Sequence, residues 1–533
     1  MLSEWLPQGT ENEPERIMTF IPAVDPRRIA ALLTVLLGAG CATLQEPERG
    51  HRESGSTAVR QCAEWFRGLD EAVDRAGVRD AGAYRIPGFP YLRVDRYSAS
   101  FRDEARASEA AFSEWIRRLR RIGTVARRAE LRNLPANEIS GIASGADQAI
   151  AMAERCAGEL ERHDTWDAAA REQVVLRSAV PDEYLDWQRA VGLYPLLALP
   201  FAQGIERWHE EAAAAFRASR AREQPSGIPV TRYALPSASP LSRSDVATLL
   251  SRARSRPLRT PEFSGQELER MFSTFAPVFE VETGGPFDRP GAPKWEKEGE
   301  LGVDSSRPVV YRRLAYTRNG HDTLVQLVYT LWFPERPGNS RFDVLAGKLD
   351  GIVFRVTLAP DGEPVLYDSI HPCGCYHMFF PTPRAQALPA PEQRMEWAFV
   401  PTTLPAMPDR SRVVVRVATR THYLLDVAPD TGAPADAAYA FEDEDNLRSL
   451  PLPGGGYRSL YAPSGLVEGT ERGESALFWP MGIPSAGAMR QWGKHATAFL
   501  GKRHFDDADL IERRFRIAPS GTAALSATDG PYK

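Results

Sequence analysis

Apolar residues recur every three or four positions through the first half of the chain, which is the pattern of amphipathic helices that bury one face. The repeats are Val59, Cys62, Phe66, Leu69 and Val73; then Phe112, Trp115, Ile116, Leu119 and Ile122; then Ile139, Ile142, Ala146, Ile150 and Ala153; then Ile205, Trp208, Ala212 and Phe216. Between the first two repeats, Arg85-Ile-Pro-Gly-Phe-Pro-Tyr-Leu92 must be extended, because proline fixes φ and lacks an amide proton. We therefore predict a helical domain over residues 57–220.

Short β-branched and aromatic runs dominate the second half. Asn319-Gly320 and Asp361-Gly362 each separate two such runs and are typical of hairpin turns. Strands are predicted at residues 309–316, 324–333, 352–358, 365–370, 395–400, 413–418 and 423–427, followed by a lone helix at 486–500. Short antiparallel strands joined by turns form a sandwich, a barrel or a curved sheet. The predicted fold class is α+β, with a helical N-terminal domain and a mainly antiparallel β domain.

The chain of 533 residues is long enough for two or three domains. Residues 221–263 are rich in Pro, Ser and Arg, and we predict a linker there with one short helix at 246–253. The β domain then covers 264–520, and a flexible tail covers 521–533.

An apolar run at Ile29–Leu37 follows two arginines and precedes small residues and Cys41. A charged region, an apolar region and small residues before a cut form the layout of a secretory signal. The segment resembles the lipobox of bacterial lipoproteins, in which the cysteine after the cut is diacylated, although Gly38 stands where that pattern usually has Leu. We therefore predict a signal peptide at 18–40, lipidation of Cys41 and a tether at 41–56. The alternative is an uncleaved membrane anchor, but the apolar run is shorter than the roughly 20 residues that a spanning helix needs.

The predicted location is the periplasmic face of the outer membrane, with the membrane as a partner through the lipid anchor. In the sorting rules of such lipoproteins, Ala42 rather than Asp after the cysteine implies the outer membrane. Residues 1–17 carry Glu4, Glu11, Glu13 and Glu15, which do not suit a signal, so we expect an upstream extension and a start at Met18.

With 65 basic and 70 acidic side chains, the chain lacks the electrostatic footprint of a nucleic-acid binder. A protein or an envelope glycan is the expected kind of further partner.

Four cysteines remain once lipid occupies Cys41. Cys62 and Cys156 fall in helical segments, where they either form a long-range disulfide, which the periplasm permits, or pack as buried thiols. The other two belong to His371-Pro-Cys373-Gly-Cys375-Tyr-His377, which places four potential metal ligands at every second residue.

This motif is the main candidate for chemistry. On a regular strand His371 and His377 would stand about 20 Å apart and could not share an ion, whereas Cys373 and Cys375 converge, and Gly374 permits a bend toward one histidine. Thiolates with imidazole favour a transition metal, zinc above copper or iron. Further ligands would come from His321, His422, His495, His504 or Asp506. The alternatives are a strained Cys373–Cys375 disulfide capable of thiol exchange, and an inert structural turn.

The chain also resembles conserved hypothetical lipoproteins of proteobacteria, a group without a known activity. The resemblance rests on Ile86-Pro-Gly-Phe-Pro-Tyr91, on Trp187-Gln188 with Gly192-Leu-Tyr-Pro195, and on Tyr367-Asp-Ser-Ile-His-Pro-Cys-Gly-Cys-Tyr-His377, and it extends over most of the mature chain. It implies a location and a shared motif but transfers no catalytic role.

Three functions are therefore open. The first is an envelope protein with a Cys/His metal site, in one form a hydrolase whose metal activates water at an open coordination position. The second is a non-enzymatic binding or assembly protein with a structural Cys/His site or a disulfide. The third is a thiol redox protein, and for none of them does the sequence identify catalytic residues.

Overall fold

The computed structural model describes residues 55–221, 227–236, 240–340, 343–392 and 395–519. The predicted upstream extension, signal peptide, Cys41, most of the tether and the tail lie outside these residues. Ser56–Lys533 forms one compact unit. Within the described ranges, no helix combines the length and apolar character that crossing a membrane requires.

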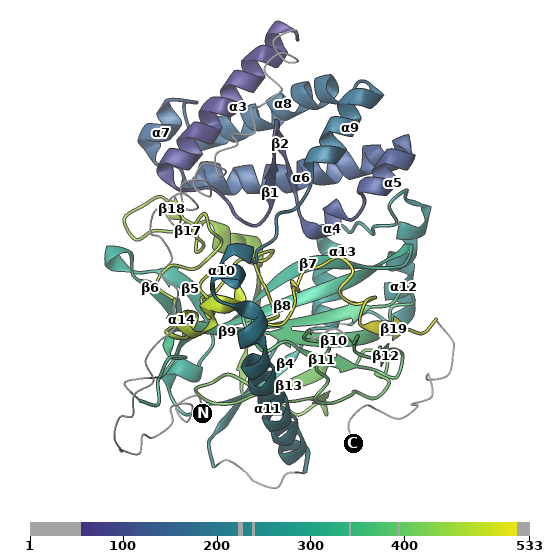
Figure 1. Cartoon of the computed structure of the whole chain (residues 1–533), viewed down its shortest axis with the longest axis vertical. Helices are drawn as coiled ribbons and strands as arrows, with labels where there is room; N and C mark the ends of the chain where they lie inside the picture. The colour runs from purple at the N-terminus through teal and green to yellow at the C-terminus, as the bar shows by residue number, and fades with distance from the viewer. Residues whose placement is uncertain (1–54, 222–226, 237–239, 341–342, 393–394, 520–533) are drawn as a thin grey trace, which may run out of the picture. The chain divides into compact units, whose positions relative to one another are not determined.

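The predicted helical region is confirmed. Three long helices pack around a small hairpin of two strands, and Figure 1 shows them as one layer. The elements are α3 (Thr57–Ala76), β1 (Tyr84–Ile86), β2 (Phe89–Val94), α4 (Arg96–Ala99), α5 (Arg102–Ala107), α6 (Glu109–Asn133), α7 (Ala136–Ser140), α8 (Ala146–Asp164), α9 (Ala168–Arg177), α10 (Asp186–Val191) and α11 (Tyr194–Ala221). The extended stretch at 85–92 is this hairpin. Helix α6 crosses it so closely that a Cβ at Gly123 would lie 2.3 Å from the carbonyl oxygen of Tyr91, so only glycine fits.

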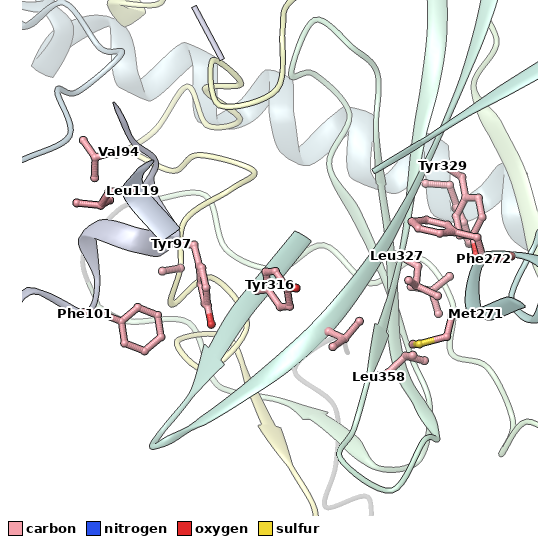
Figure 2. Packing of buried hydrophobic residues seen from close by; sticks show 14 of the residues in the cluster. Val94, Tyr97, Phe101, Leu119, Met271, Phe272, Tyr316, Leu327, Tyr329 and Leu358 are labelled. Carbon is pink, nitrogen blue, oxygen red and sulfur yellow. Dashed lines mark hydrogen bonds between the residues drawn. The ribbon is translucent and has the colours of Figure 1, made fainter. Parts of the chain in front are cut away.

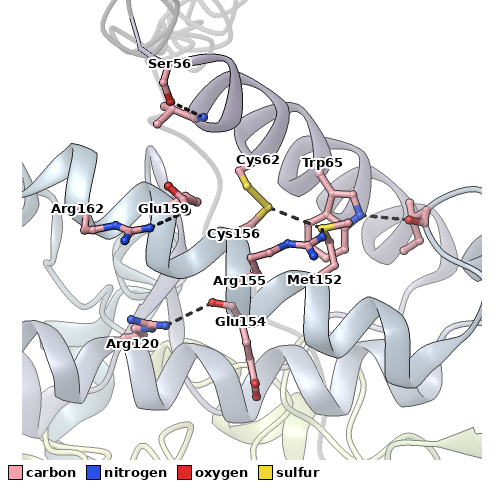
Figure 3. Close-up of a disulfide and its surroundings, with 12 residues drawn as sticks. Ser56, Cys62, Trp65, Arg120, Met152, Glu154, Arg155, Cys156, Glu159 and Arg162 are labelled. Atoms are coloured by element: carbon pink, nitrogen blue, oxygen red, sulfur yellow. Dashed lines mark hydrogen bonds and ion pairs between the residues drawn. A yellow bond between two sulfur atoms is a disulfide. The ribbon is translucent and has the colours of Figure 1, made fainter.

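A disulfide joins Cys62 on α3 to Cys156 on α8, which is one of the two arrangements left open by the sequence. Figure 3 shows it beside Met152 and Trp65, whose indole donates to the carbonyl of Ile142. The bond spans 94 residues and therefore restricts the unfolded chain strongly. Cys373 and Cys375 are free thiols.

The second half contains two open sheets that share a core. The six-stranded sheet has the order β11 (Met378–Pro381), β10 (Pro364–Ile370), β9 (Gly347–Leu358), β8 (Asp322–Arg336), β7 (Val309–Asn319) and β16 (Ala440–Asp443). The five-stranded sheet has the order β14 (Leu424–Pro429), β13 (Val413–Val417), β4 (Val278–Glu282), β3 (Val230–Ala234) and β15 (Ala437–Ala438). Most neighbouring strands are antiparallel, and over the described ranges neither sheet closes into a barrel. The α+β fold class is confirmed.

Shorter elements complete the second half. They are α12 (Arg243–Ser251), η2 (Arg252–Ser255), α13 (Gly265–Thr274), η3 (Pro286–Asp288), β5 (Ala292–Trp295), η4 (Lys297–Gly299), β6 (Leu301–Asp304), β12 (Ala385–Ala387), η5 (Glu444–Arg448), β17 (Leu450–Pro451), β18 (Tyr457–Arg458), α14 (Glu474–Phe478), η6 (Trp479–Met481) and β19 (Phe515–Ile517).

The segment predicted as a linker, residues 221–263, differs from that expectation in its described parts, although the short helix expected at 246–253 is present as α12 (Arg243–Ser251). It supplies strand β3 to the five-stranded sheet and helix α12, which Ser242 and Asp245 cap reciprocally. Buried Tyr233, Val246 and Leu250 tie these elements into the core. The segment is therefore part of the compact unit and does not act as a spacer.

One core runs from the helical layer into the sheets. Figure 2 follows it from Val94 and Leu119, through the stacked pair Tyr97 and Tyr316, to Tyr329. Buried polar contacts also join the two regions. The guanidinium of Arg448 of η5 pairs with Asp80 at 2.6 Å, and the backbone carbonyl of Arg448 accepts a hydrogen bond from the side-chain amide of Asn133 of α6 at 2.8 Å. The helical and strand-rich regions thus fold against each other.

Candidate functional site

The Cys-Gly-Cys sequence forms the tip of the hairpin between β10 and β11. The amide of Gly374 donates to the carbonyl of His371 at 2.8 Å, and the amide of His371 donates to the carbonyl of Cys375 at 3.0 Å. Gly374 has φ +90°, and a Cβ there would meet the carbonyl oxygen of Ala496 at 2.5 Å. The motif is a tight turn and not a regular strand, because only glycine permits this backbone and this close packing.

The two thiols in the turn differ in exposure and in acidity. Cys373 is buried, whereas Cys375 is partly exposed, and the amide of Cys375 donates to Cys373 Sγ at 3.4 Å. A hydrogen bond from the Cys375 thiol and the positive charge of Arg472 lower the pKa of Cys373. The same hydrogen bond, together with burial, raises the pKa of Cys375. Cys373 is therefore the more acidic of the two thiols.

A buried chain of carboxylates and imidazoles lies behind the turn. Asp350 on β9 is 3.3 Å from His371 Nδ1 through one oxygen and 2.8 Å from His422 Nδ1 through the other. His422 Nε2 in turn lies 3.3 Å from Asp288 of η3. Arg472 is 3.5 Å from Asp350. We call Asp288, His422, Asp350, His371 and Arg472 the Asp350 cluster.

Charges within the Asp350 cluster compensate one another. Burial opposes ionisation of Asp350, but Arg472 and the two histidines outweigh it and hold its pKa well below the usual value. Burial would lower the pKa of His422, yet the flanking Asp288 and Asp350 raise it. Burial lowers the pKa of His371, so this ring is neutral and donates Nδ1–H to Asp350. The cluster is a structural support that fixes one end of the turn.

Aromatic and cationic side chains cover the remaining sides of the turn. The hydroxyl of Tyr423 donates to that of Tyr376 at 2.9 Å and accepts from Arg336 at 3.1 Å. Trp208 of α11 packs on Tyr376. On the other side, Arg490 donates to the carbonyl of Cys373 at 3.1 Å. These contacts leave Cys375 as the more accessible of the two thiols.

His377 belongs to a different environment from His371. Its Nε2 is 3.0 Å from Asp368, which also receives two hydrogen bonds from Arg355, and Phe505 covers this group. Burial lowers the pKa of His377 to about 3, so the ring is neutral. His371 and His377 are therefore engaged by separate carboxylates.

The four predicted metal ligands are not gathered around one point. Across the described ranges, no group of three or more His, Cys, Asp or Glu side chains is arranged to hold a metal ion. Two of the further ligands suggested by the sequence lie beside the motif: His422 shares Asp350 with His371, and the Cα of His495 would lie 3.7 Å from a Cβ at Gly374. The others have partners or positions of their own: His504 is 3.3 Å from both Asp182 and Asp507, Asp506 pairs with Arg96, and His321 is exposed. What the motif brings together is the pair of thiols.

Glu474 of α14 is a buried carboxyl whose charge acts on both thiols. Burial raises its pKa to about 7, against the opposing effect of Arg472 and Arg336. The folded protein thus holds this proton more tightly than the unfolded chain, so the free energy of unfolding should fall as the pH rises from about 5 to about 7 and then level off.

We expect Glu474→Gln to remove this fall, so that the variant is more stable than the wild type at pH 8 and comparable to it at pH 5. Urea unfolding at pH 5, 6, 7 and 8 measures the difference. Glu468→Gln is the matched control, because Glu468 is 62% exposed and should leave the profile unchanged. Parallel profiles for Glu474→Gln and the wild type would show that Glu474 titrates normally.

Sequence reasoning singled out the motif, with a metal site as the main interpretation and a structural turn as an alternative, but it missed the charged groups that surround it. Asp350, Asp288, Arg472 and Glu474 are distant from the motif in sequence, and no spacing relates them to it. A signal did exist in the strands, because Asp350, Arg355 and Asp368 interrupt runs that are otherwise apolar and buried. A charged residue in such a run requires a buried partner.

Comparison with known proteins found no match: no family model fits the chain, and neither curated proteins nor solved structures gave a similar one.

Proposed function

We propose that this chain is a cell-envelope lipoprotein, anchored at the outer membrane through Cys41, whose Cys373-Gly374-Cys375 turn donates a disulfide to protein partners. The observation that carries the proposal is the presence of two free, unequally exposed thiols, two residues apart in one rigid turn. A signal-like segment before Cys41 and a long-range disulfide between Cys62 and Cys156 support a location outside the reducing cytosol.

The exchange begins at Cys375, the less buried of the two cysteines. With Cys373 and Cys375 oxidised to a disulfide, a partner thiolate attacks Cys375 Sγ, forms a mixed disulfide and breaks the bond to Cys373, which leaves as a thiolate. A second thiolate of the partner then attacks the partner's own sulfur in the mixed disulfide, and Cys375 leaves and takes up a proton. The partner dithiol loses two electrons and two protons. The Cys373/Cys375 pair gains the two electrons and one proton, on Cys375, and the second proton goes to the solvent because Cys373 is left as a thiolate.

The surroundings of Cys373 favour this direction. The leaving group departs faster when its pKa is low, and the hydrogen bond from Cys375 and the charge of Arg472 lower the pKa of Cys373. Stabilising the reduced form in this way also makes the disulfide more oxidising. Glu474, with a pKa of about 7, lies close enough to influence both sulfurs and can exchange protons near neutral pH.

Disulfide donation in solution tests the proposal. Residues 56–533, which form the compact unit, are oxidised and mixed with a reduced, unfolded protein containing two cysteines, and the substrate disulfide is followed by alkylation and mass spectrometry. The wild type should oxidise the substrate in proportion to its own concentration, whereas Cys373→Ser and Cys375→Ser should both be inactive.

A matched control is Cys62→Ala/Cys156→Ala, which removes the other disulfide and should retain donation at a temperature at which it is folded. Donation that persists in the Cys373→Ser and Cys375→Ser variants would place the activity elsewhere. Absence of donation by the wild type, with a metal ion bound in a one-to-one ratio that the two serine variants lose, would favour the metal site instead.

A further inference from the structure

Exposed hydrophobic side chains gather at one place on the surface. Ten large hydrophobic residues of the described chain are about half exposed or more, and six of them belong to α10, the start of α11 and α14. We call these six the apolar ridge: Trp187, Val191, Leu193, Leu196, Leu199 and Leu477, which are 50–68% exposed. Single exposed hydrophobic residues are ordinary, but a contiguous group usually marks a binding surface.

The ridge is held rigidly. Helix α10 packs on η6, where a Cβ at Gly192 would lie 2.7 Å from Pro480. The Arg189 side chain donates to the carbonyls of Met481 at 2.8 Å and Gly501 at 2.7 Å, and Trp187 meets Trp479 edge to face. Leu193, between α10 and α11, has φ +52°, a conformation that a leucine rarely adopts. The fold therefore presents these side chains to the outside at a cost in backbone strain.

The ridge lacks charge over an unusual length. Residues 190–205 contain no Asp, Glu, Lys or Arg. At its border, Lys502 pairs with both Asp182 and Asp186, and these three side chains together carry one negative charge. The tryptophan and tyrosine residues of this region are Trp187, which is 57% exposed, and the partly buried Tyr194 and Trp479. An apolar face that has no charged residue along 190–205 and exposes Trp187 beside them suits the boundary between lipid head groups and acyl chains.

We propose that the apolar ridge inserts into the interfacial region of a lipid bilayer. This goes beyond disulfide donation and rests only on the proposed anchoring at a membrane. The sequence places 14 residues between Cys41 and Ser56, which can reach at most ~50 Å, so a lipidated chain would keep the unit close to a bilayer.

The ridge and the thiol turn share an element. Helix α14 carries Leu477 in the ridge and Glu474, whose charge acts on Cys373 and Cys375. Insertion of the ridge would therefore hold the turn near the membrane surface, and partners would be envelope proteins that are close to that surface.

Vesicle binding tests the inference without the lipid anchor. Residues 56–533 are mixed with vesicles of phosphatidylethanolamine and phosphatidylglycerol at seven to three, and binding is measured by flotation and by the blue shift of tryptophan fluorescence. The wild type should bind, and binding should change little between low and high salt, because apolar burial drives it. Leu193→Glu/Leu196→Glu should lower the partition coefficient at least about tenfold, since it removes buried apolar area and adds two charges.

The control Trp166→Glu/Leu176→Glu changes two residues that are 67% and 53% exposed but lie outside the ridge, and it should bind like the wild type. Circular dichroism checks that both variants are folded. Failure of the wild type to bind, or equal binding by the Leu193→Glu/Leu196→Glu variant, would overturn the inference. A wild-type dimer that becomes a monomer in that variant, without vesicle binding, would assign the ridge to self-association. Disulfide donation in solution does not require the ridge, so failure of one proposal leaves the other testable.

Discussion

Asp350→Ala is expected to lower the free energy of unfolding by about 3–5 kcal/mol, because it breaks a buried charge network and leaves its partners without compensation. Asp350 is fully buried and is the common partner of His371, His422 and Arg472. Once it is removed, the positive charge of Arg472 remains in the core without its carboxylate partner. Denaturation in urea at pH 7 measures the loss.

Two further variants test the reason for this effect. Asp350→Asn retains the shape and should recover only part of the stability, since the amide cannot balance the charge of Arg472. Asp443→Ala, at a 65% exposed carboxylate paired with Arg312, should cost less than about 1 kcal/mol. A loss for Asp350→Ala as small as that for Asp443→Ala would show that Asp350 does not hold the cluster together.

Breaking the Asp80–Arg448 pair is expected to have an effect of similar size. Arg448 donates two hydrogen bonds to Asp80, which also accepts one from Gln491, and these groups are buried where the helical layer meets the strands. Arg448→Met should therefore cost about 3–5 kcal/mol, because the buried carboxylate of Asp80 loses its partner. Asp80→Asn should cost less, because Arg448 keeps Asp445 at 3.0 Å. The double variant should lose clearly less than the sum of the two single variants.

This pair also predicts a dependence on pH. Burial would raise the pKa of Asp80, but Arg448 overcomes it and lowers the pKa below the usual value. The stabilisation is therefore complete above the pKa of an unfolded aspartate, about 3.9, and is lost as the pH falls below it, so the wild type and Asp80→Asn should converge in acid. Unfolding measured from pH 3 to pH 7 tests this. The exposed pair of Arg458 and Glu468 is the matched control, and additive losses at Asp80 and Arg448 would contradict the coupling.

Regular periodicity made the helices and the central strands predictable. The apolar stripes on α3, α6 and α8 are the faces that pack on the hairpin, and the Asn-Gly and Asp-Gly turns join β7 to β8 and β9 to β10. The prediction of a helix at 486–500 was wrong, because Gly487 and Gly493 both have φ +89°, which a right-handed helix does not allow. The segment is instead a series of turns that packs on the thiol turn. The strand predicted at 395–400 is likewise not formed.

Prediction failed where neighbours come from distant parts of the chain. Strand β3 was hidden in a polar stretch, since a strand of five residues gives little pattern and its partner β4 lies some 50 residues away. The thiol turn was recognised from the residues themselves, but its surroundings depend on Asp350, Arg472 and Glu474, which only the folded sheet brings near. The separate carboxylate partners of His371 and His377 could not be inferred for the same reason.

A redox titration in glutathione buffers tests the central claim most directly. Residues 56–533 are equilibrated at graded ratios of reduced to oxidised glutathione, alkylated, and analysed by mass spectrometry of the peptide that contains Cys373 and Cys375. The account predicts one reversible two-electron transition at a potential above about −220 mV, more oxidising than typical structural disulfides. Thiols that never form this disulfide at any ratio would contradict disulfide donation.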